Sequence, residues 1–233
     1  MTLPFFYEPL LASSNGHFQL SEETSKHCIQ VLRMKTGEQL QLTNGKGALF
    51  KARILSEDKK KAVALIEEEL LLPRHLKKIS IAVSLLKNPA RFEWFLEKAT
   101  EIGVSEIIPL LCERTEHTRF RIDRMKQILV SAMLQSQQVW LPTLREPTLF
   151  KEVLVSAGYG LRLVAHCEDD ARNSITEFPP FSDAQILIGP EGDFTPHEIK
   201  TAMNHHYLPV TLGETRLRTE TAGVVAATLL VNK

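Results

Sequence analysis

The stretch ILIGPEGDFTPHEIKTAMNHHYLPVTLGETRLRTETAGVVAATLL, residues 186–230, decides the fold class of this chain. Two short apolar runs, 186–188 and 208–212, each lead into a glycine, and each glycine opens a polar loop that precedes a helical pattern. A repeated order of strand, loop and helix is typical of a parallel sheet. Loops that leave the carboxyl ends of such strands form the ligand crevice. The stretch therefore predicts an α/β domain with a small-molecule site, although ordinary turns between strand and helix favour the same residues.

The helices that follow the two loops have recognisable starts. Thr195 fits the N-cap position of the first helix, Pro196 fits its first helical position, and Glu198 completes a capping box with Thr195. The second helix is expected to begin within residues 219–221 and to continue as an apolar run to Leu230. The apolar end of that helix is expected to be available to a partner subunit.

The glycine spacing argues against the common nucleotide-binding motifs. The first polar loop contains Gly189 and Gly192, the second contains Gly213 alone, and no Lys-Ser or Lys-Thr pair follows them. This spacing matches neither the dinucleotide fingerprint nor the P-loop. A nucleotide-dependent metabolic enzyme is therefore disfavoured, while another kind of ligand site and plain turns both remain open.

The same stretch resembles a known family. GPEGDFTPHEI and LGETRLRTETA are similar to the C-terminal motifs of the SPOUT class of methyltransferases, and within that class to the RsmE family of ribosomal-RNA uridine-N3 methyltransferases. The resemblance implies a trefoil-knotted parallel-sheet methyltransferase domain, assigned to residues 73–233, with S-adenosylmethionine as cofactor. It also implies a homodimer that methylates N3 of a specific uridine in the decoding region of 16S ribosomal RNA. The substrate would be this small-subunit RNA within an assembled or assembling 30S particle.

The resemblance also assigns roles to individual residues. Arg218 and Glu220 are the expected catalytic residues, because loss of the N3 proton calls for a base or for a cation that stabilises the uridine anion. A simple ion pair between Arg218 and Glu220 or Glu214 is the plainer alternative. No metal is expected, since no spacing of His, Cys and Asp suggests a site. The expected cofactor-binding residues are His166, Ile188, Gly189, Pro190, Glu191, Gly192, Leu212, Gly213, Leu217 and Arg218.

Residues 1–72 are expected to form a small β-rich domain of the barrel type, with a short helix after Ser21. The run HCIQVLRMKTGEQLQLTNGKG resembles the RsmE family, in which this region is a PUA-like RNA-binding domain. That resemblance makes Arg33 an RNA contact, although a solvated arginine is the plainer alternative. The strands are expected at residues 5–7, 17–20, 39–43, 48–55 and 62–70, with a hairpin at Asn44-Gly45.

Beyond residue 77 the apolar pattern changes to that of an α/β domain. An apolar run at 79–86 predicts a buried strand, and residues 91–102 predict a helix that Gly103 closes. Further strands are expected at 107–111 and 161–166. The last of these ends at His166, for which the pattern alone favours a structural role at a strand end. The resemblance to the RsmE family, which has cofactor contacts near this position, makes a ligand contact an equal alternative.

A basic segment follows the strand at 107–111. Residues 113–126 carry most of the local positive charge, which can bind phosphates or form a solvated face. KNPARFEWFLEKATEIGV and ERTEH resemble the RsmE family, whereas Leu134 and residues 137–139 depart from its pattern. The RNA contacts expected in this part of the chain are Arg91, Arg114 and Gln135. We expect loss of Arg114 to weaken RNA binding and to spare the cofactor, and loss of Arg218 to slow methylation.

Composition narrows the remaining choices. The 233 residues carry 28 Lys and Arg against 28 Asp and Glu, so any RNA contact depends on a local patch. Three distant cysteines fit neither a disulfide framework nor a zinc site, and with no secretory signal pattern and no membrane-spanning run they predict a cytoplasmic protein. A noncatalytic RNA-binding or ribosome-assembly protein is the alternative, and a cofactor-binding measurement separates it from a methyltransferase.

Overall fold

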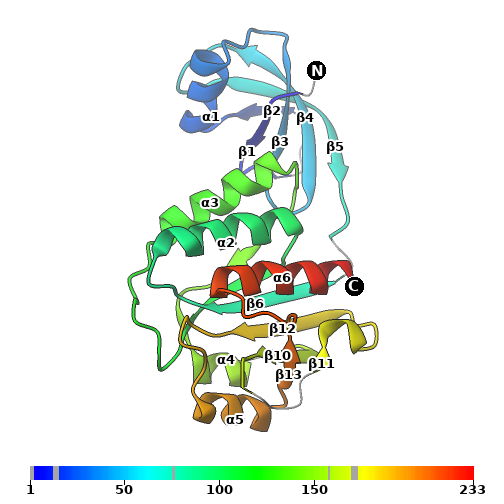
Figure 1. Cartoon of the computed structure of the whole chain (residues 1–233). Coiled ribbons are helices and arrows are strands. Elements are labelled where there is room, and N and C mark those ends of the chain that lie inside the picture. Colours follow the sequence, from blue (N-terminus) through cyan, green and yellow to red (C-terminus); the bar gives the residue numbers. More distant parts are fainter. Residues whose placement is uncertain (1–2, 13–15, 75–76, 157, 169–172) are drawn as a thin grey trace. The chain divides into compact units, whose positions relative to one another are not determined.

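The computed structural model of the protein describes residues 3–12, 16–74, 77–156, 158–168 and 173–233. The chain divides into two compact units (Figure 1). The first unit is Met1–Arg74 together with Met133–Leu141, and the second is His75–Ala132 together with Pro142–Lys233. In the described part of the chain, no helix has both the length and the apolar character needed to cross a membrane.

The first unit is built on a five-stranded sheet. The small β-rich domain expected from the sequence is therefore confirmed, with β1 pairing parallel to β3 and the other neighbours antiparallel. Alternate residues of β4, such as Phe50, Ala52 and Ile54, are fully buried, which is how a strand with one face on a core is patterned. The strand order is β1 (Phe5–Tyr7), β3 (Gln39–Thr43), β4 (Ala48–Ser56), β5 (Val63–Leu71) and β2 (Gly16–Gln19).

The helix after Ser21 differs from the prediction in its second half. The α-helix α1 (Glu22–Lys26) begins at Ser21, whose Oγ accepts a hydrogen bond from the Thr24 amide at 3.3 Å. A π-helical turn, His27–Val31, then replaces the α-helix, with the Leu32 amide donating to the His27 carbonyl at 2.9 Å. The wider turn accompanies the burial of Cys28 in the core of this unit. This burial depends on tertiary packing, so helix propensity alone does not predict the turn.

A distant segment, Met133–Leu141, completes the first unit, which the boundary at residue 72 does not anticipate. Trp140 pairs with Lys46 in an isolated bridge and donates from Nε1 to the Leu72 carbonyl at 3.1 Å. A Cβ on Gly47, whose φ is +97°, would lie 2.3 Å from the Trp140 ring, so only glycine allows this approach. Packing between residues so far apart in sequence leaves no local pattern.

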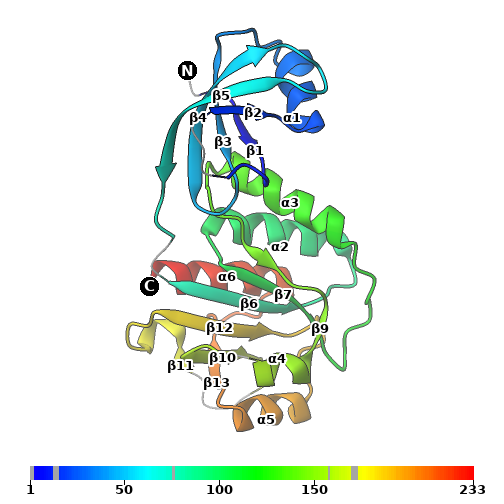
Figure 2. The ribbon, with the colours of Figure 1, turned by 180° about the vertical axis from the view of Figure 1, so that it is seen from behind.

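The second unit contains an eight-stranded sheet whose paired neighbours are all parallel (Figure 2). The predicted α/β class is confirmed, and the strands at 79–86, 107–111, 161–166, 186–188 and 208–212 are all present with slightly different bounds. The order is β11 (Asn173–Ser174), β13 (Leu208–Thr211), β10 (Leu161–Ala165), β12 (Asp183–Ile188), β6 (Lys78–Ser84), β7 (Glu106–Leu111) and β8 (Thr143–Leu144), with β9 (Thr148–Leu149) also on β7. The trefoil knot stays a prediction.

Helices cover both faces of this sheet. On one face, α4 (Phe150–Ser156) and α5 (Pro196–Asn204) share a core with β6, β7, β10 and β12. On the other face, α6 (Thr219–Asn232) lies on β6 and β12 and packs against α2 (Pro89–Ile102), while α3 (Ile122–Gln135) follows β7 in the chain. Leu230 and Val231 are buried inside the unit, whereas Val224, Val225 and Leu229 are half-buried, so a partner contact of α6 stays a prediction.

The helix start and helix end predicted from the sequence are present in the second unit. Thr195 and Glu198 form the predicted capping box at the start of α5, and Pro196 is its first residue. Gly103 ends α2 in the left-handed conformation with φ +97°. At the crossing of α2 and α6, a Cβ on Gly223 would meet Phe95 at 2.6 Å, so this glycine lets the two helices approach closely.

Candidate ligand site at the carboxyl edge of the sheet

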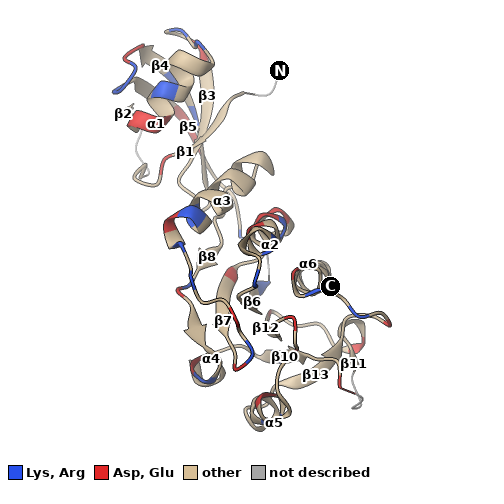
Figure 3. Ribbon diagram, turned by 60° about the vertical axis from the view of Figure 1, so that its left-hand side comes forward, with Lys and Arg blue, Asp and Glu red and all other residues tan. Residues whose placement is uncertain are grey.

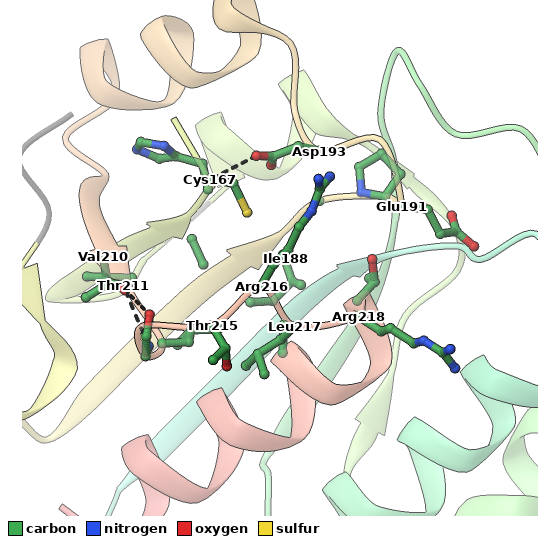
Figure 4. A pocket seen from close by; sticks show the side chains of 18 of the residues that line it. Cys167, Ile188, Glu191, Asp193, Val210, Thr211, Thr215, Arg216, Leu217 and Arg218 are labelled. Atoms are coloured by element: carbon green, nitrogen blue, oxygen red, sulfur yellow. Dashed lines mark hydrogen bonds between the residues drawn. The ribbon is translucent and has the colours of Figure 1, made fainter. Parts of the chain in front are cut away.

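A pocket of about 330 Å³ opens at the carboxyl ends of β10, β12 and β13 (Figure 4). Its walls are the loops that follow these strands and the first turns of α6, as expected for a parallel sheet. The volume lies at the small end of the range for small-molecule sites. The lining residues are Arg91, Ala165, His166, Cys167, Ile188, Gly189, Pro190, Glu191, Asp193, Val210, Thr211, Leu212, Gly213, Thr215, Arg216, Leu217, Arg218, Thr219 and Ala222.

The loop after β12, residues 189–194, is closed by Asp193. The Asp193 backbone has a left-handed φ of +63°, and Asp193 Oδ1 accepts a hydrogen bond from the Phe194 amide at 2.8 Å. Its Oδ2 accepts from the Cys167 amide in the loop after β10 at 2.7 Å, a bond drawn in Figure 4. A Cβ on Gly189 would lie 3.0 Å from the Phe194 nitrogen, so the turn has little room for a larger residue.

The same loop is bound to two further loops at this edge. Glu191 accepts from the Lys87 amide at 3.1 Å, which ties it to the loop after β6. Arg114, after β7, donates from Nη1 to the Gly192 carbonyl at 2.6 Å and to the Phe194 carbonyl at 3.4 Å. The 189–194 loop therefore makes hydrogen bonds to the loops of three other strands.

The loop after β13, residues 212–218, is bonded mainly within itself. Thr211 Oγ1 donates to the Gly213 carbonyl at 2.9 Å, and Gly213 has a φ of +142° with no heavy atom within 4 Å of an added Cβ. Arg216 extends from this loop toward Asp193, and Arg218 extends to the side on which α2 lies (Figure 4). Both arginine side chains are exposed.

Arg91 and Glu220 form an ion pair beside the pocket. Arg91 Nε lies 3.6 Å from Glu220 Oε1, and the side chains are 39% and 9% exposed. Glu220 Oε2 is buried and has no hydrogen-bond partner among the described residues. Arg91 lines the pocket whereas Glu220 does not, so Glu220 can act on a ligand only through Arg91 or after a rearrangement.

The structure brings together all of the predicted cofactor residues except Gly192. Gly192 lies beneath Arg114, whose Cδ would be 3.5 Å from a Cβ at that position. Of the predicted catalytic residues, Arg218 lines the pocket and Glu220 lies behind Arg91. These positions are compatible with the predicted roles, which stay predictions.

The predicted RNA contacts fall in both units. Arg33 lies in the first unit with a left-handed φ of +58°, and Gln135 belongs to the segment that completes that unit. Arg91 and Arg114 belong to the second unit, where both already have partners. Arg124 of the basic segment forms a further ion pair with Glu93 of α2, and both signs of charge are present at the start of α3 (Figure 3).

Several lining residues were not predicted from the sequence as cofactor contacts. Cys167 and Thr215 are the clearest cases, because each is an ordinary polar residue of a turn when its neighbours in space are not known. The sequence indicates Asp193 and Arg216 only as polar residues that could supply a base or a cation. The available signal for Asp193 was a non-glycine residue directly after Gly192 in a tight turn, since Asp is one of the few residues that tolerate the left-handed region.

The pocket combines apolar side chains with cations. Ile188, Leu212 and Leu217 supply the apolar side chains, and Arg91, Arg216 and Arg218 supply the positive charge. The described residues contain no group of three or more His, Cys, Asp and Glu placed to hold a metal ion. Such a pocket suits a ligand with an aromatic ring, together with a reactant on which negative charge develops.

Two family models match the chain. The model described as an RNA methyltransferase domain matches residues 73–231, and the model described as an RNA methyltransferase PUA domain matches residues 20–67. The chain is 27% identical to ribosomal RNA small subunit methyltransferase E of Rickettsia conorii, over 92% of this chain and 89% of that protein. It is 31% identical to the protein of the same name from Mesomycoplasma hyopneumoniae, over 65% of this chain and 68% of that protein.

Three solved structures are similar to this chain over nearly its whole length. A probable rRNA-methyltransferase from Porphyromonas gingivalis is 36% identical with a TM-score of 0.90, covering 97% of this chain and 95% of that one. A putative methyltransferase from Legionella pneumophila, in complex with the bound cofactor SAM, is 31% identical with a TM-score of 0.87, covering 99% and 97%. Ribosomal RNA small subunit methyltransferase E from Neisseria gonorrhoeae, bound to S-adenosyl methionine, is 28% identical with a TM-score of 0.87, covering 97% and 95%.

Proposed function

We infer that this chain, which belongs to the RsmE family of RNA methyltransferases, transfers a methyl group from S-adenosylmethionine to small-subunit ribosomal RNA. The observation that carries this proposal is the pocket at the carboxyl ends of β10, β12 and β13. The chains from Legionella pneumophila and Neisseria gonorrhoeae that resemble it over nearly their whole length were solved with S-adenosylmethionine.

The residues present fit this cofactor. The volume of about 330 Å³ suits a nucleoside-sized ligand, and the apolar side chains of Ile188 and Leu217 suit the two faces of an adenine ring. Backbone groups of Leu212 and Gly213 would read the edge of the base, because Gly213 leaves that backbone uncovered. When bound, S-adenosylmethionine supplies an electrophilic methyl group on a positively charged sulfur.

The protein's part in the reaction is positioning and charge. Methyl transfer is an in-line displacement, so holding donor and acceptor together supplies much of the acceleration. We propose that the acceptor is N3 of a uridine, which must lose its proton before or during the attack. Arg218 would stabilise the uridine anion. Glu220 would hold Arg91 in place, since it touches Arg91 and not the pocket.

The proposal extends to the RNA-binding parts of the chain. The first unit, with Arg33 and Gln135, would hold the RNA as a PUA-like domain comprising residues 1–72, with the added segment Met133–Leu141 as its support. The decoding-region uridine of 16S ribosomal RNA, the 30S particle, the homodimer, the trefoil knot and a cytoplasmic location are also part of the proposal, and they rest on the resemblance to the RsmE family.

Two measurements test the function. Calorimetry with S-adenosylmethionine should show saturable binding with one site per chain. Small ribosomal subunits from a strain that lacks this protein should accept a labelled methyl group, and nucleoside analysis should then identify 3-methyluridine. Binding of RNA without any binding of S-adenosylmethionine would instead identify a noncatalytic RNA-binding or ribosome-assembly protein.

A further inference from the structure

We propose that Asp193 is a positioning residue for the cofactor, and that its strained backbone is retained because its carboxylate holds two loops of the pocket in register. This inference rests on the proposed function, because it concerns how the same pocket binds S-adenosylmethionine. It assigns a role to a residue whose side chain is directed at the protein's own backbone.

The backbone of Asp193 is unusual for a residue with a side chain. The described non-glycine residues with positive φ are Arg33, Gln137, Asp193 and His206, and of these only Asp193 lines the pocket. Glycine adopts this conformation without strain, whereas side chains are disfavoured there. A strained residue at a ligand site persists when the surrounding structure or the function requires its side chain.

The side chain has two partners from different parts of the chain. One carboxylate oxygen accepts from the Phe194 amide of its own loop, and the other accepts from the Cys167 amide of the loop after β10, at 2.8 and 2.7 Å. The strands that lead into these loops are neighbours, with Ala165 paired to Ile188 at their carboxyl ends. The pairing of β10 and β12 ends at these two residues. Beyond them, the Asp193 carboxylate connects the two loops that follow the strands.

The turn around Asp193 is held from the other side as well. Arg114 donates to the carbonyls of Gly192 and Phe194, which flank Asp193 in the chain. The position of the carboxylate is therefore set by the basic loop after β7, and it sets the position of the loop after β10 in turn.

The loop after β10 matters because it is a wall of the pocket. His166 and Cys167 both line the pocket, and His166 is 4% exposed. Without the bond from the Cys167 amide to Asp193, these two residues would lose the contact that aligns them with the 189–194 loop. A displacement of about 1 Å in a ligand-positioning group can cost about 100-fold in function.

The test compares three substitutions at Asp193 with a matched control. Asp193→Gly and Asp193→Ala both remove the carboxylate, but glycine relieves the backbone strain and alanine keeps it. Asp193→Asn keeps one acceptor oxygen of the two. His206→Gly is the control, because His206 has a φ of +64°, is exposed, and does not line the pocket.

We expect the glycine and alanine variants to bind S-adenosylmethionine about 10-fold more weakly than the wild type, by equal amounts, although their melting temperatures differ. The asparagine variant should lie between them and the wild type, and His206→Gly should bind like the wild type. Hydrogen exchange at the Cys167 amide should become faster in both the glycine and alanine variants and stay unchanged in His206→Gly.

Two results would overturn the inference. Wild-type affinity in Asp193→Gly would show that the carboxylate does not position the pocket. A loss of affinity that follows the loss of melting temperature across all four variants would show that Asp193 is only structural. Failure of the wild-type protein itself to bind S-adenosylmethionine would contradict the proposed function instead, so the two failures are distinguishable.

Discussion

The two main walls of the pocket are loops of similar size that differ in how they are held. The 189–194 loop makes hydrogen bonds to the loops after β6, β7 and β10 through Glu191, Arg114 and Asp193. In the 212–218 loop, by contrast, the described residues 214–217 make no hydrogen bond or ion pair to another loop, and Gly213 is bonded only to Thr211.

The difference indicates how the work of binding is divided. A wall that is already held by cross-loop bonds loses little conformational freedom when the ligand arrives, so it contributes preorganisation. A wall with local bonds only must be ordered by the ligand, and it can deliver its arginines after the ligand is in place. We therefore expect the 189–194 loop to control affinity and the 212–218 loop to control the rate of transfer.

The largest effect on cofactor binding should come from placing a larger side chain inside the 189–194 loop. Gly189→Val should weaken S-adenosylmethionine binding by more than about 100-fold, because even a Cβ there lies 3.0–3.2 Å from Phe194 and Asp193 atoms. Gly189→Ala and Gly213→Ala are the size-matched pair, because a Cβ at Gly213 meets nothing and only the φ of +142° opposes it. Calorimetry should rank Gly189→Ala below Gly213→Ala, and equal losses in this pair would contradict the contrast between the walls.

The sequence by itself suggests a stronger result for the second loop, in which a bulky residue at Gly213 blocks the ligand. The sequence alone therefore predicts that Gly213→Val abolishes S-adenosylmethionine binding while the protein stays folded, whereas the division between the two loops predicts a smaller loss than in Gly189→Val. Since no protein atom is near that position, any such loss would come from the ligand's own approach to the backbone or from the strained φ. Calorimetry of this variant beside Gly213→Ala separates the two causes, because both substitutions share the strain.

The next effect concerns Arg218 of the 212–218 loop. Arg218→Ala should lower the single-turnover rate of methylation by about 100-fold and change cofactor affinity little, because its cation is expected to act on charge that develops in the transition state. Arg218→Lys, which keeps a positive charge, should recover part of the rate. A wild-type rate in Arg218→Ala would show that this loop does not take part in the chemical step.

A smaller effect should follow from removing the Arg114 side chain, which holds the 189–194 loop. The sequence alone predicts that Arg114→Ala weakens RNA binding and spares the cofactor, but its hydrogen bonds to the Gly192 and Phe194 carbonyls predict otherwise. We expect cofactor affinity to fall by about 5- to 10-fold, close to the net contribution of one typical hydrogen bond, because Arg114 acts on the cofactor only through the loop. Arg119→Ala, an exposed arginine of the same basic segment, is the control and should affect only RNA binding and its salt dependence.

The smallest change should be seen in thiol reactivity. Burial raises the pKa of Cys28 and of Cys112 to about 12, so both thiols stay protonated and unreactive near pH 8, whereas Cys167 is exposed. Alkylation should therefore occur first at Cys167, and saturating S-adenosylmethionine should slow it a few-fold because Cys167 lines the pocket. Alkylation of Cys167 at the same rate with and without saturating S-adenosylmethionine would place the ligand elsewhere.

Much of the fold could be predicted because its signals are local. The apolar runs of β6 and β12, the capping box of Thr195 and Glu198, and the left-handed Gly103 depend on neighbours within a few residues. The π-helical turn at His27–Val31 could not be predicted in this way, because burial of Cys28 in a distant core accompanies it.

The sequence by itself determined the parallel sheet, the small β unit before it and the two loops that line a pocket, since periodicity, caps and turn glycines act over short distances. The tertiary structure alone decided that Met133–Leu141 joins the first unit, that Glu220 lies behind Arg91, and that Asp193 and Arg114 hold the loops together. Each of these depends on groups that lie close in space and far apart in sequence. No local pattern records such a pair, because each partner by itself is an ordinary polar or apolar residue.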